Sequence, residues 1–264
     1  MAGHFIAIVQ ARLASTRLPR KPLADLGGLP MVVRVAQRAA ASGAARVVVA
    51  ADADETVAAC ARHGVEALLT SPAHLTGTDR LAEAAALLRL PPETLVVNVQ
   101  GDEPLIPPAV VGDVAALLAR RSDCAMATAA HPLADAADFF SPHVVKVVTD
   151  RNGRALLFSR APIPWARDAF ASDRHRLPAG LPALRHVGLY AYRAGFLARY
   201  PGLPRAPIEE QESLEQLRAL WHGEGSAVLA VQSPLPPGGA TPEDGALVRG
   251  LLATGARGRL GRGR

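Results

Sequence analysis

The chain has 264 residues, of which 49% are hydrophobic, and this is enough for one large α/β domain with an insertion. It shows no apolar run of about 18 residues and no leader pattern, so we expect neither a membrane span nor secretion. Four of its arginines lie in the last eight residues, which leaves a nearly neutral body with few aromatic side chains and argues against nucleic acid as a partner.

The two cysteines indicate the cellular compartment of the protein. Cys60 and Cys124 are isolated, without the spacing of a metal site, and are predicted to be buried thiols in a reducing compartment. We therefore expect a cytoplasmic protein.

Residues 254–264 are rich in Arg and Gly, and are expected to form a disordered tail.

Apolar strands and amphipathic helices alternate regularly over the first 120 residues. The expected strands are Phe5–Val9, Arg46–Ala50, Val65–Leu69 and Thr94–Val99, and the expected helices are Pro30–Ala41, Asp54–His63, Thr78–Leu90 and Pro108–Arg120. The strands are continuous apolar runs, as in strands that helices cover on both faces. The alternation predicts an α/β fold with a doubly wound, mostly parallel sheet.

The pattern changes after about residue 124, where strands follow one another with short links. We expect strands at Cys124–Ala130, Val144–Asp150, Ala155–Phe158, His186–Arg193 and Ser226–Val231, and helices at Ile208–Trp221 and Pro242–Leu252. Asn152-Gly153 is a hairpin signal, and Ala161–Leu184 is expected to be a long loop or a projecting arm. The sequence thus predicts one domain over residues 1–253, with a smaller β-rich region inserted at roughly 124–222.

A loop rich in cations follows the first expected strand. It carries Arg12, Arg17, Arg20 and Lys21. Loops at the carboxyl ends of parallel strands hold phosphates in α/β proteins, and cations with free backbone N–H groups can bind a triphosphate there. The loop matches neither GxxxxGK[ST] nor GxGxxG. The alternative is a solvated basic loop.

The run Asn98-Val-Gln-Gly-Asp-Glu-Pro104 follows the fourth expected strand of this half. It places Asp102 at the same sheet edge as the cationic loop. A carboxylate there suits Mg²⁺, which keeps several waters and bridges to substrate phosphates. The alternative is an Asp that caps a turn.

Several segments together resemble one family, the CMP-Kdo synthetases (3-deoxy-manno-octulosonate cytidylyltransferases) of lipopolysaccharide biosynthesis. The resemblance implies a Rossmann-like nucleotidyltransferase fold with helices on both faces of the sheet, CTP and the acidic sugar Kdo as substrates, Mg²⁺ as cofactor, and a homodimer whose inserted region binds sugar and the second subunit. The segments that carry it are Val9–Leu23, His74–Arg80, Asn98–Pro104, Phe158–Trp165, Arg185–Tyr192, Leu214–Arg218 and Thr241–Asp244.

The resemblance also implies a role for individual residues. Arg12 and Lys21 would bind the CTP phosphates, and with Asp102, the expected metal ligand, they form the catalytic set. The other nucleotide residues would be Ala11, Ser15, Gly77, Thr78, Arg80 and Gln100, and the sugar residues would be Gln100, Arg160, His186, Tyr190, Glu215 and Gln216. His186 could instead be a hydrogen-bonded strand histidine, and Glu215 a solvated helix residue.

The chain departs from the family pattern at three places. Gln10 replaces a Pro, Ser141-Pro-His143 replaces Asn-Pro-Asn, and Ala240 replaces an Asp that serves as second metal ligand. A methyl group cannot bind Mg²⁺. Either Asp102, water and phosphate oxygens suffice, or Glu243 or Asp244 substitutes, or turnover is impaired.

Three alternatives to Kdo activation therefore stay open at this stage. The first is a cytidylyltransferase for another acidic sugar, such as 8-amino-Kdo. The second is a nucleotide-binding protein that has lost turnover because of Ala240, and the third is a nucleic-acid-binding protein that uses the arginine tail.

Overall fold

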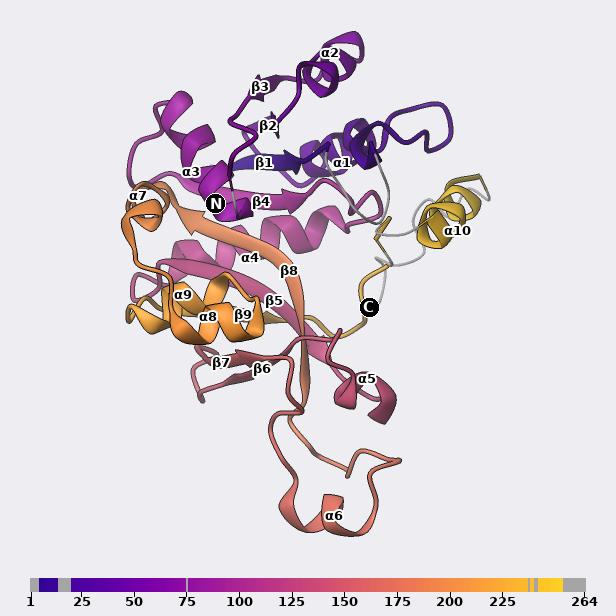
Figure 1. The fold of residues 1–264 in the computed structure, drawn as a ribbon, viewed down its shortest axis with the longest axis vertical. Coiled ribbons are helices and arrows are strands. Elements are labelled where there is room, and N and C mark those ends of the chain that lie inside the picture. The colour runs from indigo at the N-terminus through magenta and orange to yellow at the C-terminus, as the bar shows by residue number, and fades with distance from the viewer. Residues whose placement is uncertain (1–4, 14–19, 75, 237, 240–241, 254–264) are drawn as a thin grey trace.

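A nine-stranded mixed sheet forms the centre of the computed structural model, which describes residues 5–13, 20–74, 76–236, 238–239 and 242–253 (Figure 1). The strand order is β3-β2-β1-β4-β8-β5-β9, and a hairpin of β6 and β7 joins the sheet through β8. The strands are β1 (Phe5–Ala11), β2 (Arg46–Ala51), β3 (Ala67–Leu69), β4 (Leu95–Gln100), β5 (Met126–Pro132), β6 (Lys146–Thr149), β7 (Ala155–Ser159), β8 (Leu184–Arg193) and β9 (Ser226–Ala230).

Strand β8 is the element that makes the sheet mixed. Strands β1 to β4 pair in parallel, and so do β5 and β9, whereas β8 runs antiparallel to both β4 and β5. The two parallel groups consequently point the same way, and their carboxyl ends share one edge. The predicted α/β fold with a mostly parallel sheet is confirmed.

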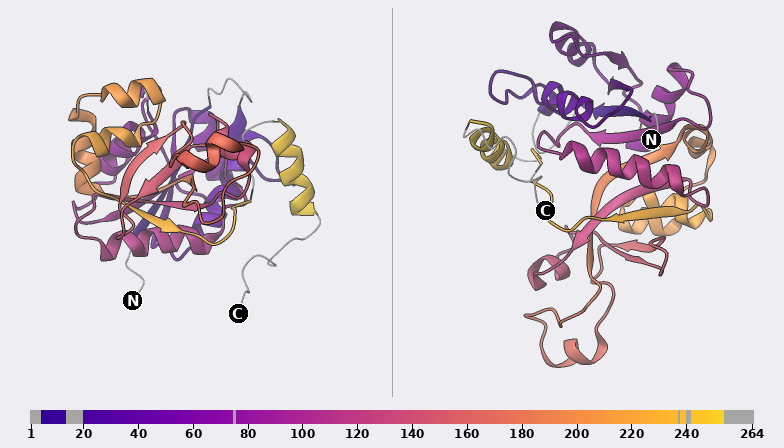
Figure 2. Two further views of the ribbon diagram at one scale, coloured as in Figure 1. Left: turned by 90° about the horizontal axis from the view of Figure 1, so that it is seen from below. Right: turned by 180° about the vertical axis from the view of Figure 1, so that it is seen from behind.

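Helices cover both faces of this sheet (Figures 1 and 2). Helices α1 (Met31–Ala40) and α4 (Pro108–Arg120) pack with one set of alternating strand residues, and α3 (Gly77–Leu87) and α7 (Ala194–Arg199) pack with the other set. None of the described helices is long and apolar enough to cross a membrane. The remaining helices are α2 (Asp54–Arg62), α5 (Ala136–Phe140), α6 (Arg167–Ser172), α8 (Pro207–Glu212), α9 (Gln216–Trp221) and α10 (Pro242–Ala253), with short 3₁₀ turns η1 (Lys21–Leu23) and η2 (Tyr200–Gly202).

Local sequence signals explain several element boundaries. The hydroxyl of Thr76 accepts the backbone N–H of Asp79 at 3.1 Å and caps the N-terminus of α3. Helix α2 stops before Gly64, whose φ of 67° lies in the left-handed region that glycine adopts freely. Val248 of α10 is buried with Leu26 and Met31, which anchors the last helix beside α1.

The expected helix over Ile208–Trp221 is wrong as a single element. The structure has two short helices there, α8 and α9, because Ser213 takes a left-handed φ of 49° between them. Similarly, the helix expected over Thr78–Leu90 ends at Leu87, just before Arg89 with a φ of 51°. The short helices α5, α6 and α7 were not expected from the sequence.

The segment between β7 and β8 projects from the body, as predicted for Ala161–Leu184 (Figure 1). An aromatic cluster joins this segment to α5: the ring of Phe170 lies 5.1 to 5.6 Å from those of Phe139, Phe140 and Trp165. The predicted turn at Asn152-Gly153 is confirmed, with β6 and β7 forming the hairpin. Within the 124–222 stretch, however, β5 and β8 belong to the main sheet. The expected tail, residues 254–264, lies outside the described residues.

Candidate active site

Lys21, from the predicted cationic loop, and Asp102 meet at the carboxyl edge of β1 and β4, as expected. The register Gln10↔Gln100 brings the two strand ends side by side. Lys21, which is buried in η1 with 8% of its surface exposed, forms an ion pair with the carboxylate of Asp102. Gly101 is required between the strand and Asp102, because a side chain there would collide with the carbonyl oxygen of Gln10.

Arg12 and Arg80 differ in how exposed they are at this edge of the sheet. Arg12 is exposed directly after the buried Ala11, whereas Arg80 is buried in α3. Arg80 pairs with Asp52 at 3.7 Å, and Asp52 accepts the backbone N–H of Leu13 at 2.8 Å. Burial lowers the pKa of Arg80, and the nearby charge of Arg12 adds to this effect. Arg80 thus supports the backbone of Leu13, just after β1, through Asp52. The predicted loop residue Ser15 lies outside the described residues.

Glu215 connects the predicted nucleotide segment to the predicted sugar segment. Its carboxylate accepts the backbone N–H of Gly77 at 3.1 Å and the hydroxyl of Thr78 at 2.9 Å. These groups begin helix α3, where an anion is favourable. Burial raises the pKa of Glu215, although the hydrogen bonds oppose the shift. The adjacent Gln216 is buried as the first residue of α9.

His186 and Tyr190 belong to a row of rings on β8. The His186 ring lies 4.8 Å from that of Phe158 and 5.3 Å from that of Tyr190, and its Nε2 lies 3.0 Å from the hydroxyl of Thr128. Burial lowers the pKa of His186 to about 3, so the ring is neutral at physiological pH. Burial also raises the pKa of Tyr190, which keeps its hydroxyl protonated. Both side chains can offer neutral hydrogen-bonding groups.

Arg160 lies at the end of β7, at the base of the projecting segment. Its Nε donates to the carbonyl oxygen of Glu212 at 2.7 Å, and its Nη1 donates to that of Pro142 at 3.0 Å. Strand β7, which directly precedes Arg160, includes Phe158, whose ring packs against that of His186. The structure therefore groups these sugar-side candidates around β7 and β8.

Sequence reasoning missed two amides in this site. Asn98 is completely buried on β4, and within the described part of the chain neither its Oδ1 nor its Nδ2 has a hydrogen-bond partner. The same holds for Nε2 of Gln10 on β1. Buried polar atoms without partners are costly, so they point to a bound group or water on this face. A visible signal was the single Asn inside the apolar run Leu95–Val99.

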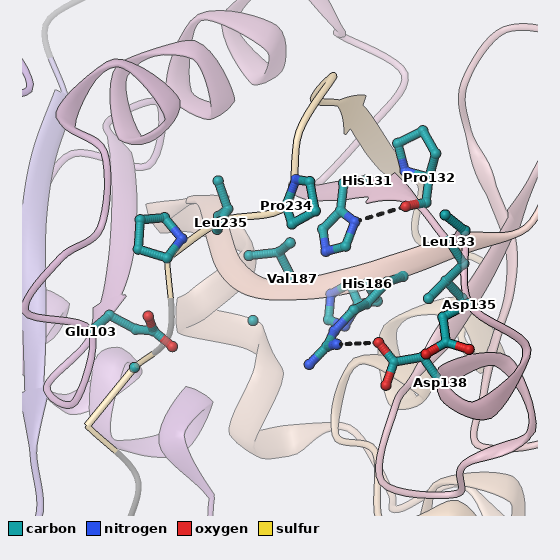
Figure 3. A pocket seen from close by; sticks show the side chains of 15 residues that line it. Glu103, His131, Pro132, Leu133, Asp135, Asp138, His186, Val187, Pro234 and Leu235 are labelled. Carbon is teal, nitrogen blue, oxygen red and sulfur yellow. Dashed lines mark hydrogen bonds and ion pairs between the residues drawn. The ribbon is translucent and has the colours of Figure 1, made fainter. Parts of the chain in front are cut away.

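A cavity of about 530 Å³ adjoins the Asp102 edge (Figure 3). Glu103 lies on one side and Asp138 on the other (Figure 3), and the lining also includes His131, Val187 and Arg185, which forms an ion pair with Asp138. Burial raises the pKa of Glu103 to about 7, and the charges of Asp102 and Asp244 add to the shift. The charge of Lys21 opposes the shift, and a further cation bound nearby would likewise favour the charged form of Glu103.

Comparisons with known proteins agree with this geometry. Residues 6–226 match the family model described as cytidylyltransferase. The chain belongs to this family and is a nucleotidyltransferase. It is 62% identical to the 3-deoxy-manno-octulosonate cytidylyltransferases of Leptothrix cholodnii and Methylibium petroleiphilum, over 92% and 94% of this chain and 89% and 95% of theirs. Within the family it therefore belongs with the 3-deoxy-manno-octulosonate cytidylyltransferases.

Solved structures give the same result for the fold. A CMP:2-keto-3-deoxy-manno-octonic acid synthetase, solved in complex with CTP, is 37% identical and superposes with a TM-score of 0.85 over 96% of this chain and 99% of that one. A cytidylyltransferase from Leptospira borgpetersenii, at 16% identity, has a TM-score of 0.60 over 96% of this chain and 88% of that one, and shares the fold.

Proposed function

We propose that this chain transfers a cytidylyl group from CTP to Kdo, which yields CMP-Kdo and pyrophosphate for lipopolysaccharide biosynthesis. The ion pair of Lys21 with Asp102, placed at the shared edge of β1 and β4, is the observation that carries the proposal. It brings a phosphate-binding cation and a metal-binding carboxylate to one point. The close relatives named above support the choice of substrates.

Arg12 and Lys21 would stabilise the negative charge that develops on the phosphates. The anomeric hydroxyl oxygen of Kdo forms a bond to the α-phosphorus of CTP, the bond from that phosphorus to the β-phosphate oxygen breaks, and the hydroxyl proton is released. Arg12 is exposed beside the strand end, and Lys21 can exchange Asp102 for phosphate oxygens. Cations fixed where charge develops supply a large share of catalysis in such reactions.

The carboxylates of this edge fit a magnesium ion that arrives with the nucleotide. Among the described residues, no three His, Cys, Asp or Glu side chains form a group that could hold a metal alone. Asp102 has 28% of its side chain exposed, so it can contribute one ligand while water and phosphate oxygens contribute the others. When bound, Mg²⁺ would neutralise charge on the phosphates.

The sugar end supplies neutral polar groups and one cation. We assign the hydroxyls of Kdo to Gln100, His186, Tyr190 and Gln216, and its carboxylate to the guanidinium of Arg160. Glu215 would join the two ends, since it already bonds to Gly77 and Thr78.

A pyrophosphate-release assay with CTP, Kdo and Mg²⁺, each omitted in turn, tests the proposal. We expect release only with all three, and faster release with Kdo than with 8-amino-Kdo. A reversed sugar preference would favour the related sugar, whereas calorimetric CTP binding without release would identify a homologue impaired by Ala240.

We also propose a homodimer in a reducing cytoplasm. Leu156 on β7 and Trp165 on the projecting segment have 62% and 47% of their surface exposed, and a second copy would cover them. Cys60 and Cys124 are buried free thiols, which suits a reducing compartment. Light scattering of the purified protein tests the dimer, and a monomeric mass would contradict it.

A further inference from the structure

Lys146 is a fully buried cation that the proposed reaction does not use. It is one of two lysines among the 29 Lys and Arg residues of the chain, and its side chain is completely buried on β6. The ammonium donates to the carbonyl oxygens of Ser141, Val144 and Arg160 at 2.9, 2.6 and 2.6 Å. Its three donors are therefore satisfied within the fold, and a substrate cannot reach them.

Glu212 contacts both the backbone and the side chain of Arg160. Its carboxylate accepts the backbone N–H of Arg160 at 2.9 Å and the hydroxyl of Ser159 at 2.5 Å. Its carbonyl oxygen accepts Nε of Arg160 at 2.7 Å. The opposite charge of Glu212 also faces Lys146 and partly offsets the burial that lowers the pKa of that lysine.

These contacts fix Arg160 at its backbone and along one side of its guanidinium. Lys146 also binds the 141–144 loop, whose Pro142 carbonyl accepts Nη1 of Arg160 at 3.0 Å. Within the described residues, no acceptor bonds to Nη2 of Arg160. One nitrogen of a rigidly oriented guanidinium is thus left for an anion, and carboxylates are suitable partners for it.

We infer that Lys146 and Glu212 are positioning residues that aim the guanidinium of Arg160 at the carboxylate of the sugar acid. The inference rests on the proposed sugar role of Arg160. It also explains why Ser141 and His143 can replace the usual Asn residues, since the loop takes part through main-chain carbonyls.

The residue type at position 146 supports this role. An ammonium can donate to three carbonyls around one point, whereas the planar guanidinium of Arg needs acceptors in its own plane. The chain uses Arg for nearly all its cations, so a Lys kept in a closed carbonyl cage indicates that the compact ammonium is required there.

Steady-state kinetics of Lys146→Met and Glu212→Gln test the inference. Each is expected to raise KM for Kdo about tenfold, the loss expected for a hydrogen bond of ordinary strength to a charged group, and to leave KM for CTP within twofold. In an Arg160→Ala background, neither change should raise KM for Kdo further. Arg151→Met, which removes an exposed charge from the turn of the same hairpin, is the matched control and should leave both KM values unchanged.

Additive effects in the Arg160→Ala background, or an equal rise in KM for CTP, would overturn the positioning role. An unchanged KM for Kdo in Arg160→Ala alone would overturn the sugar role of Arg160 as well. Glu212→Gln keeps the side-chain volume, so it provides the answer if Lys146→Met does not fold.

Discussion

The two lysines of this chain lie in regions with opposite properties. At the edge of β1 and β4, Lys21 pairs with one carboxylate, and the side chains of Lys21 and Asp102 are 10% and 28% exposed. At the base of the projecting segment, the side chain of Lys146 is completely buried, and its ammonium donates to three carbonyl oxygens. Lys21 can exchange its single ionic partner for a phosphate. Lys146 cannot leave its three acceptors without leaving buried carbonyl oxygens unsatisfied. We therefore propose that the first region binds substrate and that the second supports Arg160.

Asp102→Asn should have the largest effect, because it breaks the exchangeable pair and removes the proposed metal ligand. The amide keeps the shape and loses the charge, so we expect turnover to fall by at least about 10³-fold while the fold is retained. Pyrophosphate release and a thermal unfolding curve measure the two quantities. Substantial residual turnover at saturating Mg²⁺ would place the metal elsewhere, and Asp244 would be the first residue to examine.

Loss of a cation from the same edge should have the next largest effect. Lys21→Ala or Arg12→Ala is expected to lower kcat/KM by at least about 10²-fold, as for the loss of one preorganised donor to a developing charge. Stability should change little for Arg12→Ala because Arg12 is exposed. If either variant keeps the wild-type kcat/KM, its residue does not act in the site.

The sugar side should respond more selectively. We expect His186→Ala and Tyr190→Phe to raise KM for Kdo about tenfold and to change KM for CTP much less, because only the sugar loses a polar partner. Both rings also belong to the packed row on β8. Equal increases in the two KM values would therefore show that the row acts as support, like the Lys146 cage.

Ala240→Asp should have the smallest effect. Gly239 donates its backbone N–H to the carbonyl oxygen of Asp102 at 2.6 Å, so position 240 directly follows a residue bound to the proposed metal ligand. A carboxylate there would restore the usual second ligand, and we expect activity to stay the same or rise a few-fold at low Mg²⁺. A sharp loss of turnover with intact CTP binding would mean that this chain has rebuilt its metal site.

The parallel half of the fold was largely predictable because its signals are local. Apolar runs of strand length, separated by amphipathic helices, define β1 to β4, and the shared carboxyl edge then follows from parallel pairing. The proximity of the Arg12 loop to Asp102 could be predicted for this reason. The break at Ser213 could not, because neither glycine nor proline marks it within Ile208–Trp221.

Support residues were the part of the site that the sequence did not indicate. The burial of Lys146 depends on carbonyls from residues 141, 144 and 160, which converge only after the hairpin has formed. Likewise, the ion pair of Arg80 with Asp52, which joins α3 to the end of β2, was not expected from the sequence. Such contacts carry no periodicity along the chain, so motif and pattern could not reveal them.

The contrast between the two lysines can be measured directly, because the chain has only these two. Protein labelled with ¹³Cε-lysine should give two side-chain signals in a heteronuclear NMR spectrum, assigned with Lys146→Met. On titration with CTP, we predict that the Lys21 signal shifts to a saturating value as phosphate replaces Asp102, while the Lys146 signal stays in place. An unmoved Lys21 signal at saturating CTP, or a Lys146 shift of equal size, would contradict the assignment of the edge of β1 and β4 as the site that binds the triphosphate.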